Sequence, residues 1–316
     1  MSTLKTKGDY PAVVTFNRPM GPSYYRLGLA FSGEGASVFS GFMPGQFVEI
    51  DITSTAMPDP ALVPPHLEDA MVRQILLRRP FSICALRTGP DQATIEIIYA
   101  AIGPATLRLT SCRPSDILQV MGPLGRGFWM PEGKTTALMI AGGVGAPPIQ
   151  HLACTLAQHG ACPNLTLFTG SRSLKDLPFE WQQDNQAVIL PELSNLATPI
   201  DIHLATDDGS YGHHGLVTGP LIEWLAQHDS PRENIILYAC GPEPMLKAIA
   251  QIGIDHDIDS QISMERRMAC GINLCQGCAV ELRPACPCQK DNPENTIYKM
   301  CCQDGPVFEG KDVVFE

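Results

Sequence analysis

The cysteines near the C-terminus constrain this chain more than any other feature of its sequence. Seven of the twelve cysteines fall between Cys270 and Cys302. In an intracellular chain of 316 residues, such clustering indicates metal or redox chemistry rather than a disulfide framework. The remaining five are scattered, as small core residues usually are: Cys84, Cys112, Cys154, Cys162 and Cys240.

The spacing of the clustered cysteines points to one kind of metal site. Cys270, Cys275 and Cys278 form a C-x4-C-x2-C run, and this run with one later cysteine is a spacing that holds a [2Fe–2S] cluster. Gly271 and Gly277 would let the backbone approach the inorganic sulfides, whereas zinc would favour paired C-x2-C knuckles. Spacing alone leaves the fourth ligand open among the later cysteines, which are Cys286, Cys288, Cys301 and Cys302.

Charge and hydropathy exclude several functional classes. The net charge is −11 and no basic run stands out, which argues against a nucleic-acid partner. The N-terminal 14 residues have no apolar core, so they are not a signal peptide. No apolar run approaches the roughly 20 residues that a membrane helix needs. We therefore expect a cytoplasmic chain without a membrane partner.

The first part of the chain, to about Pro131, reads as short strands separated by Gly and Pro. Many short strands with turn punctuation predict an antiparallel β-barrel or sandwich. Thr53–Gln74, with four prolines, interrupts the rhythm and is expected to be an inserted surface loop with one short helix. The expected strands are Val13–Phe16, Tyr24–Leu29, Gln46–Ile50, Phe81–Ala85 and Thr94–Tyr99.

From Lys134 onward, buried-type strands alternate with helices, which predicts an α/β layer with a mostly parallel sheet. The part from Asp259 is rich in cysteine and is expected to be loop-like. Within it Arg283–Asn295 looks like an insertion, and we interpret Cys286 and Cys288 as free thiols of that loop rather than a second metal site. The expected strands are Thr136–Ala141, Leu165–Thr169, Asp201–Ala205 and Ile235–Ala239, and the expected helices are Pro148–Gln158, Leu221–Gln227 and Pro244–Gln251.

Two turns of the α/β part have sequences that are typical of nucleotide-binding sites. One Gly-rich turn follows a strand and opens a helix, so its N–H groups and the helix N-terminus can meet a pyrophosphate. The other follows the last expected strand, at the carboxyl end where open sheets bind ligands. The expected contacts are Gly142, Gly143 and Gly145 from the first turn and Gly241, Pro242 and Met245 from the second.

A short motif in the first part has flavin-binding character. Arg79 can pair with a phosphate, Phe81 can stack on a flavin ring, and Ser82 can bond a ring nitrogen, although such a tetrapeptide alone is weak. Further on, Gly122–Phe128 is interpreted as a turn that joins the first two domains.

Taken in order, these motifs resemble the ferredoxin-reductase superfamily, and with the cluster placed last the chain is similar to the electron-transfer subunits of two-subunit, NAD-linked dihydroorotate dehydrogenases. The resemblance implies an FAD-binding β-barrel domain (1–131), an NAD-binding α/β domain (132–258) and a small [2Fe–2S] domain (259–316). It is carried by Arg79–Ile83, Gly122–Phe128, Ala141–Gly145, Thr206–Ser210, Cys240–Pro242, Met264–Gly271 and Cys302–Phe308.

The resemblance also implies roles for single residues. It places the fourth cluster ligand at Cys302, beside Cys270, Cys275 and Cys278. Cys240 would either position the nicotinamide or be a packed core thiol. The chain departs from the superfamily at Phe81, where many members have Tyr, and at its less glycine-rich turn 103–106. The implied FAD contacts are Arg79, Pro80, Phe81, Ser82, Ile98, Tyr99, Ala100, Ala105 and Thr106.

Three functional hypotheses follow. In the first, electrons pass from nicotinamide through FAD and the cluster to an FMN-containing dihydroorotate dehydrogenase catalytic subunit of pyrimidine synthesis, in a heterotetramer of two plus two chains. In the second, a related reductase serves another acceptor, such as a hydrogenase, a sulfur reductase or an oxygenase. In the third, the chain is a binding or redox-sensing module that keeps the cluster but has no turnover. The choice between NADH and NADPH stays open, since Arg172 alone is weak support for a 2′-phosphate site.

Overall fold

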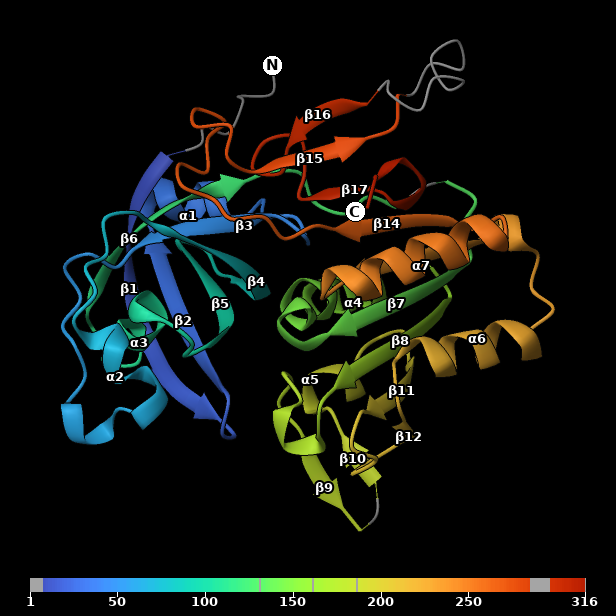
Figure 1. Cartoon of the computed structure of the whole chain (residues 1–316), viewed down its shortest axis with the longest axis horizontal. Coiled ribbons are helices and arrows are strands. Elements are labelled where there is room, and N and C mark those ends of the chain that lie inside the picture. Colours follow the sequence, from blue (N-terminus) through green and yellow to red (C-terminus); the bar gives the residue numbers. More distant parts are fainter. Residues whose placement is uncertain (1–7, 131, 161, 186, 285–295, 316) are drawn as a thin grey trace.

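The structure, a computed structural model, describes residues 8–130, 132–160, 162–185, 187–284 and 296–315. Figure 1 shows a β-barrel, in blue and teal, beside a sheet flanked by helices, with the C-terminal strands lying across both. Among the described residues, no helix is both long and apolar enough to cross a bilayer.

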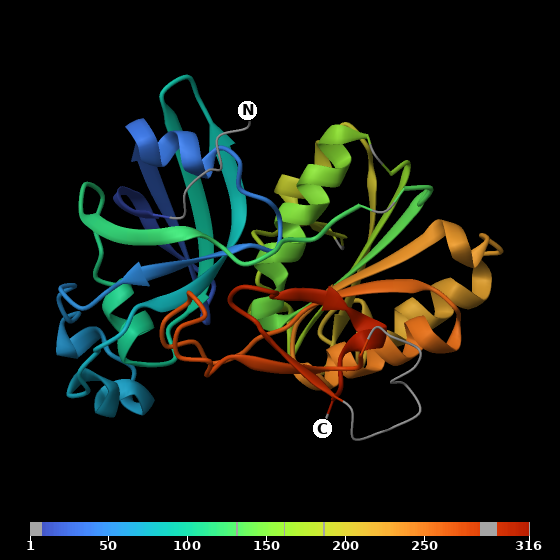
Figure 2. The ribbon, with the colours of Figure 1, turned by 90° about the horizontal axis from the view of Figure 1, so that it is seen from above.

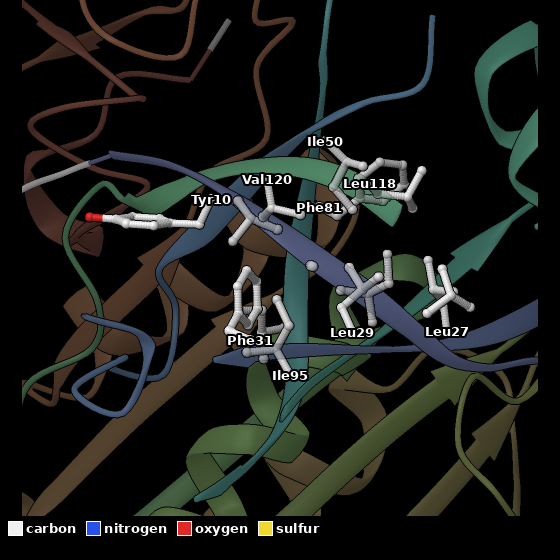
Figure 3. Close-up of a cluster of buried hydrophobic side chains, with 14 of the residues drawn as sticks. Tyr10, Leu27, Leu29, Phe31, Ile50, Phe81, Ile95, Leu118 and Val120 are labelled. Carbon is white, nitrogen blue, oxygen red and sulfur yellow. The ribbon is translucent and has the colours of Figure 1, made fainter. Parts of the chain in front are cut away.

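Six antiparallel strands close the barrel in the order β1-β2-β5-β4-β3-β6, as expected for an antiparallel barrel. Because side chains alternate along a strand, every second residue of β2 points inward, and Figure 3 shows Leu27, Leu29 and Phe31 doing so. The strands are β1 (Gly8–Met20), β2 (Tyr24–Ser32), β3 (Phe47–Asp51), β4 (Arg79–Thr88), β5 (Gln92–Ala100) and β6 (Ile117–Leu124).

The prediction of a turn over Gly122–Phe128 is wrong in its first half. Gly122 and Leu124 lie in β6, where Gly122 pairs with Gly8 of β1 and Leu124 pairs with Phe47 of β3. Long-range pairing on both sides overrides the turn preference of a Gly-Pro pair, because the strand is needed to close the barrel.

Short helices decorate the barrel: α1 (Gly33–Phe39), α2 (Glu68–Met71) and α3 (Pro104–Leu109). The expected insertion, 53–74, holds α2 and two 3-10 turns, Pro60–Leu62 and Pro65–Leu67. It packs against the barrel because Leu67 and Ala70 are buried together with Leu107 of α3.

A seven-stranded sheet forms the second layer, in the order β12-β11-β8-β7-β13-β14-β17. All neighbouring pairs are parallel except β14 with β17. Figure 1 shows the carboxyl ends of β7, β8 and β14 pointing toward the barrel. The seven strands are β7 (Thr136–Gly142), β8 (Asn164–Ser171), β11 (Ile200–Thr206), β12 (His213–His214), β13 (Ile235–Cys240), β14 (Asp259–Ser263) and β17 (Val307–Glu309).

Helices cover this sheet, and three of them match the expected ones. They are α4 (Ala146–His159), α5 (Pro191–Ser194), α6 (Thr218–Gln227) and α7 (Glu243–Asp255). A small hairpin, β9 (Gln182–Asp184) and β10 (Ala187–Ile189), stands apart from the sheet. Helix α4 is buried along most of its length because it lies between the sheet and the barrel, where it contacts β4.

The expectation of a loop-like C-terminal part holds for residues 264–278 but is wrong in four short segments that form strands. β14 (Asp259–Ser263) and β17 (Val307–Glu309) extend the sheet beyond β13, and β15 (Ala279–Leu282) pairs with β16 (Ile297–Met300). These strands are three to five residues long and gain their stability from neighbouring chain segments, which a local pattern does not reveal. Cys286 and Cys288 lie outside the described residues, and the domain division at residue 258 stays a prediction.

Candidate functional site

The four cysteines that are expected to bind iron lie in one loop region, and backbone N–H groups point at their sulfurs. The N–H groups of Leu274 and Cys275 donate to Cys270 Sγ, both at 3.3 Å. The Asn273 N–H donates to Cys302 Sγ at 3.2 Å, and the Cys302 N–H donates to Cys278 Sγ at 3.5 Å. Such donors stabilise negative charge on sulfur, so the loop suits thiolates.

The loop backbone is wound tightly enough to aim these donors inward. Gly271, Asn273 and Gln276 all have φ between +56° and +66°, the left-handed region that is uncommon outside glycine. Desolvation tends to raise the pKa of Cys270, but hydrogen bonds from the backbone of Cys275 and its neighbours outweigh it and lower that pKa to about 7. These donors favour the thiolate form of Cys270, which is the form that binds iron.

The residues present fit an iron–sulfur cluster. In the described residues, three ligating side chains do not converge on a single ion-sized point, so the fit rests on the N–H···S contacts and the loop conformation. Cys275 is exposed at the loop surface, whereas Cys278 and Cys302 are buried beneath it.

A cavity of about 270 Å³ lies where the barrel meets the sheet. Its barrel wall contains most of the expected flavin contacts, and its sheet wall contains Cys240 and residues at the end of β14 and in the segment that follows it. A mainly apolar cleft with a few polar groups suits a flavin ring. The expected residues that line it are Pro80, Phe81, Ser82, Ile98, Tyr99, Ala100, Thr106 and Cys240.

Some expected flavin residues face elsewhere. The rings of Phe81 and Tyr99 border the cavity but belong to the barrel core, where they meet edge to face at 6.3 Å (Figure 3 shows Phe81). Ala105 is buried, and Arg79 Nη1 donates to the carbonyls of Leu77 and Arg78 rather than lining the cavity. Alternation along β4 instead turns Pro80 and Ser82 outward, toward the sheet.

A second cavity, of about 430 Å³, opens over the carboxyl ends of β7, β8 and β13. The glycines of both expected nucleotide turns meet here because the two strands end side by side. A Cβ on Gly142 would lie 2.7 Å from Met245 Sδ, and one on Gly145 would collide with the Cys240 carbonyl. Gly142, Gly143, Pro242 and Met245 line the cavity, and Gly145 and Gly241 pack behind it.

Cys240 lies at the end of β13, between the two cavities. Cys240 lines the cavity of about 270 Å³, called the flavin-sized cavity below, together with Ser82, and it is almost fully buried. Burial raises its pKa far above the usual value, so it stays a neutral thiol. Both of its expected roles, positioning a nicotinamide and packing in the core, therefore stay open.

Sequence reasoning missed several cavity residues. Tyr24 of β2 closes the larger cavity, and Ser263 and Glu265 line the smaller one. Arg266, which lines the same cavity, is tied to Glu243 of α7 at 3.0 Å. The stretch Met264–Gly271 was a usable signal, because it begins directly after a strand whose carboxyl end meets the barrel.

Two family models match the chain. Residues 139–251 match the oxidoreductase NAD-binding domain. Residues 265–314 match the iron-sulfur cluster binding domain of dihydroorotate dehydrogenase B. These two ranges contain the larger cavity's glycine turns and all four cysteines that are expected to bind the cluster.

Curated relatives match nearly the whole chain. A Geobacillus protein (strain WCH70) named dihydroorotate dehydrogenase B (NAD(+)), electron transfer subunit, is 33% identical over 95% of this chain and 96% of its own. The protein of the same name from Bacillus caldolyticus is 35% identical over 86% of both chains.

Solved structures share the fold. An NADH-dependent reduced ferredoxin-NADP oxidoreductase superposes with a TM-score of 0.67 at 21% identity, over 99% of this chain and 91% of that one. A ferredoxin NADP+ reductase from Neisseria gonorrhoeae, solved with bound FAD and NADP, gives a TM-score of 0.54 at 15% identity, over 78% of this chain and 91% of that one.

Proposed function

Because this chain belongs to the family of dihydroorotate dehydrogenase B electron-transfer subunits, we propose that it carries electrons between a catalytic subunit that oxidises dihydroorotate and NAD(H). The relatives' names carry NAD(+), which favours NAD+ as the final electron acceptor. The physiological direction is then opposite to the expected flow from nicotinamide to partner, and the same sites serve either direction.

One observation carries this proposal: a very short stretch of chain joins the flavin-sized cavity to residues 270–278. This loop, called the cluster loop below, contains three of the four expected iron ligands. Met268 lines the cavity, and Cys270 follows two residues later. Two residues span at most roughly 7 Å. A flavin ring in the cavity and a cluster on the loop would therefore be close neighbours, as electron transfer between them requires.

The chain's own residues would position the cofactors. When bound, FAD links two-electron to one-electron transfer and the cluster carries single electrons. Ser82 offers a hydroxyl at the cavity wall, Arg79 offers a guanidinium at the start of β4, and Cys240 adds a neutral thiol to the sheet wall. Gly142 and Gly143 leave room for a dinucleotide in the larger cavity.

We further propose that the partner is an FMN-containing subunit in a two-plus-two heterotetramer, and that it contacts the chain around Gly271–Gly277 and Gln303–Phe308. Exposed apolar side chains support the first of these ranges: Leu274 is 80% exposed and Ile272 is 51% exposed. In the second range Gln303 is exposed, whereas residues 305–308 are buried. Single exposed apolar side chains are common on protein surfaces, but two on one short loop favour a contact with a partner protein.

The test is reconstitution with the catalytic subunit from the same genome. The chain alone should reduce artificial dyes with NADH but should not oxidise dihydroorotate, and the co-purified complex should couple dihydroorotate oxidation to NAD+ reduction. A Leu274→Asp variant should weaken complex formation while keeping dye reduction, with Ile254→Asp, an exposed residue of α7, as the control.

Three results would contradict the proposal in different ways. Dihydroorotate oxidation by the chain alone would contradict its role as a relay. A complex without NAD-linked activity would favour a reductase for another acceptor. A purified chain without FAD absorbance would favour a redox-sensing module.

A further inference from the structure

Glu49 is a fully buried carboxyl group with no assigned role. It lies in the middle of β3, with 0% of its surface exposed, and neither carboxylate oxygen has a hydrogen-bond partner among the described residues. Burying a carboxylate without partners is costly, and native proteins rarely retain such a group without a functional reason.

The side chain points away from the barrel core. Val48 and Ile50 are the β3 residues that pack inside the barrel, so alternation places Glu49 on the other face, together with Phe47. Phe47 lines the flavin-sized cavity and packs with the C-terminal core. Glu49 also pairs with Pro80, another cavity residue, on the neighbouring strand.

On this outer face the carboxyl lies directly against the cluster loop. A Cβ placed on Gly271 would lie 2.7 Å from Glu49 Oε1 and 2.9 Å from Cδ. Gly271 has φ +65° and immediately follows Cys270, one of the four expected cluster ligands. Glu49 thus belongs to β3, the strand whose Phe47 borders the flavin-sized cavity, and its carboxyl faces the loop that is expected to hold iron.

Nearby cations do not neutralise this carboxyl directly. Arg78 pairs with Asp9 at 2.6 Å, and Arg79 donates to the carbonyls of Leu77 and Arg78. Burial raises the pKa of Glu49, and the more distant charges of Arg78 and Arg79 oppose that rise. The group is not one half of a buried ion pair, which would be the ordinary structural explanation.

We propose that Glu49 is a positioning residue for the cluster: its side chain packs against Gly271, and in its ionised form it lowers the reduction potential of the cluster. Burial opposes ionisation of this carboxyl, but once it is ionised a negative charge beside a one-electron centre disfavours the reduced, more negative state. This inference rests on the proposed cluster at Cys270, Cys275, Cys278 and Cys302, and the wild-type iron content tests that premise separately.

The experiment compares Glu49→Gln, which is neutral and nearly isosteric, with Glu49→Asp, which keeps the charge, in the full chain loaded with FAD and iron. Glu309→Gln is the control, because Glu309 is a partly exposed carboxylate of the C-terminal part that pairs with Lys311. The measurements are iron content, the electron paramagnetic resonance spectrum of the reduced cluster, and its midpoint potential by redox titration.

Glu49→Gln should keep its iron and shift the potential upward. At a fixed potential we expect the ratio of reduced to oxidised cluster to rise about tenfold, which is about 59 mV for a one-electron couple. Glu49→Asp and Glu309→Gln should stay close to wild type.

Two outcomes would overturn the inference: an unchanged potential in an iron-replete Glu49→Gln protein, or equal shifts in Glu49→Gln and Glu49→Asp. If Glu49→Gln retains no iron, the Glu49→Asp variant tests the inference instead. A Glu49→Asp protein that keeps its iron and has the wild-type midpoint potential supports the inference, and loss of iron from Glu49→Asp overturns it. Absence of a cluster from the wild type would instead count against the proposed function.

Discussion

Cys301 and Cys302 are neighbours in the sequence, but their thiols contact different segments of the chain. Cys301 Sγ donates to the carbonyl oxygen of Met264 at 3.2 Å, in the buried core under β14. Cys302 Sγ instead accepts the N–H of Asn273, in the cluster loop, at 3.2 Å. This difference supports Cys302 as the fourth ligand, a choice that spacing alone leaves open.

Replacing these two cysteines singly should therefore have opposite effects on iron. Cys302→Ala should lose the visible absorbance and most of the iron, because one of four thiolates is removed. Cys301→Ala should keep both, at a small cost in stability from the lost buried thiol. Iron analysis of the two purified variants checks this, and a full cluster in Cys302→Ala would contradict the assignment.

Arg79 should contribute to FAD affinity although it does not line the cavity in the present structure. Its Nη1 is held by the Leu77 and Arg78 carbonyls, which fixes the guanidinium at the start of β4. Losing a charge-assisted bond to phosphate in Arg79→Ala should cost about 1.5–3 kcal/mol, or about ten- to a hundredfold in affinity. FAD titration of the apoprotein measures it. Arg73→Ala, at an exposed pair with Asp69, is the control, and equal affinities would contradict the role.

The architecture could be predicted where local patterns decide it. Five barrel strands and four sheet strands follow from alternation and buried apolar runs, and each expected segment lies in or overlaps a strand. β6 was missed because Gly122 and Pro123 favour a turn locally, and only pairing with β1 and β3 makes them a strand. β14 was missed because its sequence, Asp-Ser-Gln-Ile-Ser, is polar, yet it is buried as a neighbour of β13.

The site could be predicted only in its motifs. Cysteine spacing and glycine turns identify local backbone requirements, so the sequence predicts the cluster loop and both nucleotide turns, and their ligands stay predictions. Glu49 and Tyr24 lie in the middle or at the start of ordinary strands, and their proximity to the site depends on contacts between distant segments. No local pattern carries that information.

Gly145 should tolerate no side chain. A Cβ there would collide with the carbonyl of Cys240 and the backbone of Gly241. The Cys240 backbone cannot easily shift, because β13 is paired with β7 on one side and β14 on the other. Gly145→Ala should destabilise the chain by about 1–3 kcal/mol and reduce NADH-dependent dye reduction. Gly89→Ala is the control, because its Cβ would meet only Gln92 O at 3.8 Å. Urea unfolding of both variants checks this, and equal midpoints would contradict it.

The last prediction concerns Arg26, whose side chain is 1% exposed and joins the barrel to the sheet domain. Within the barrel, its Nε donates to Glu96 at 2.7 Å. Across the interface, its two terminal nitrogens donate to both oxygens of Glu192, in α5, at 2.8 and 2.6 Å. This paired geometry holds α5 of the sheet domain against the barrel.

Arg26→Met should therefore affect both stability and turnover. Glu96 would lose its main partner while only 5% exposed, although Arg87 still reaches it at 2.9 Å, and breaking one side of a buried pair typically costs about 3–5 kcal/mol. The looser interface should slow dye reduction by NADH even in protein that retains FAD. Arg18→Met is the matched control, because Arg18 pairs with Glu180 across the same interface but is 52% exposed, and it should cost at most about 1 kcal/mol. Urea unfolding and stopped-flow flavin reduction measure the two effects, and equal losses in both variants would mean that burial of the Arg26 pair does not hold the two layers together.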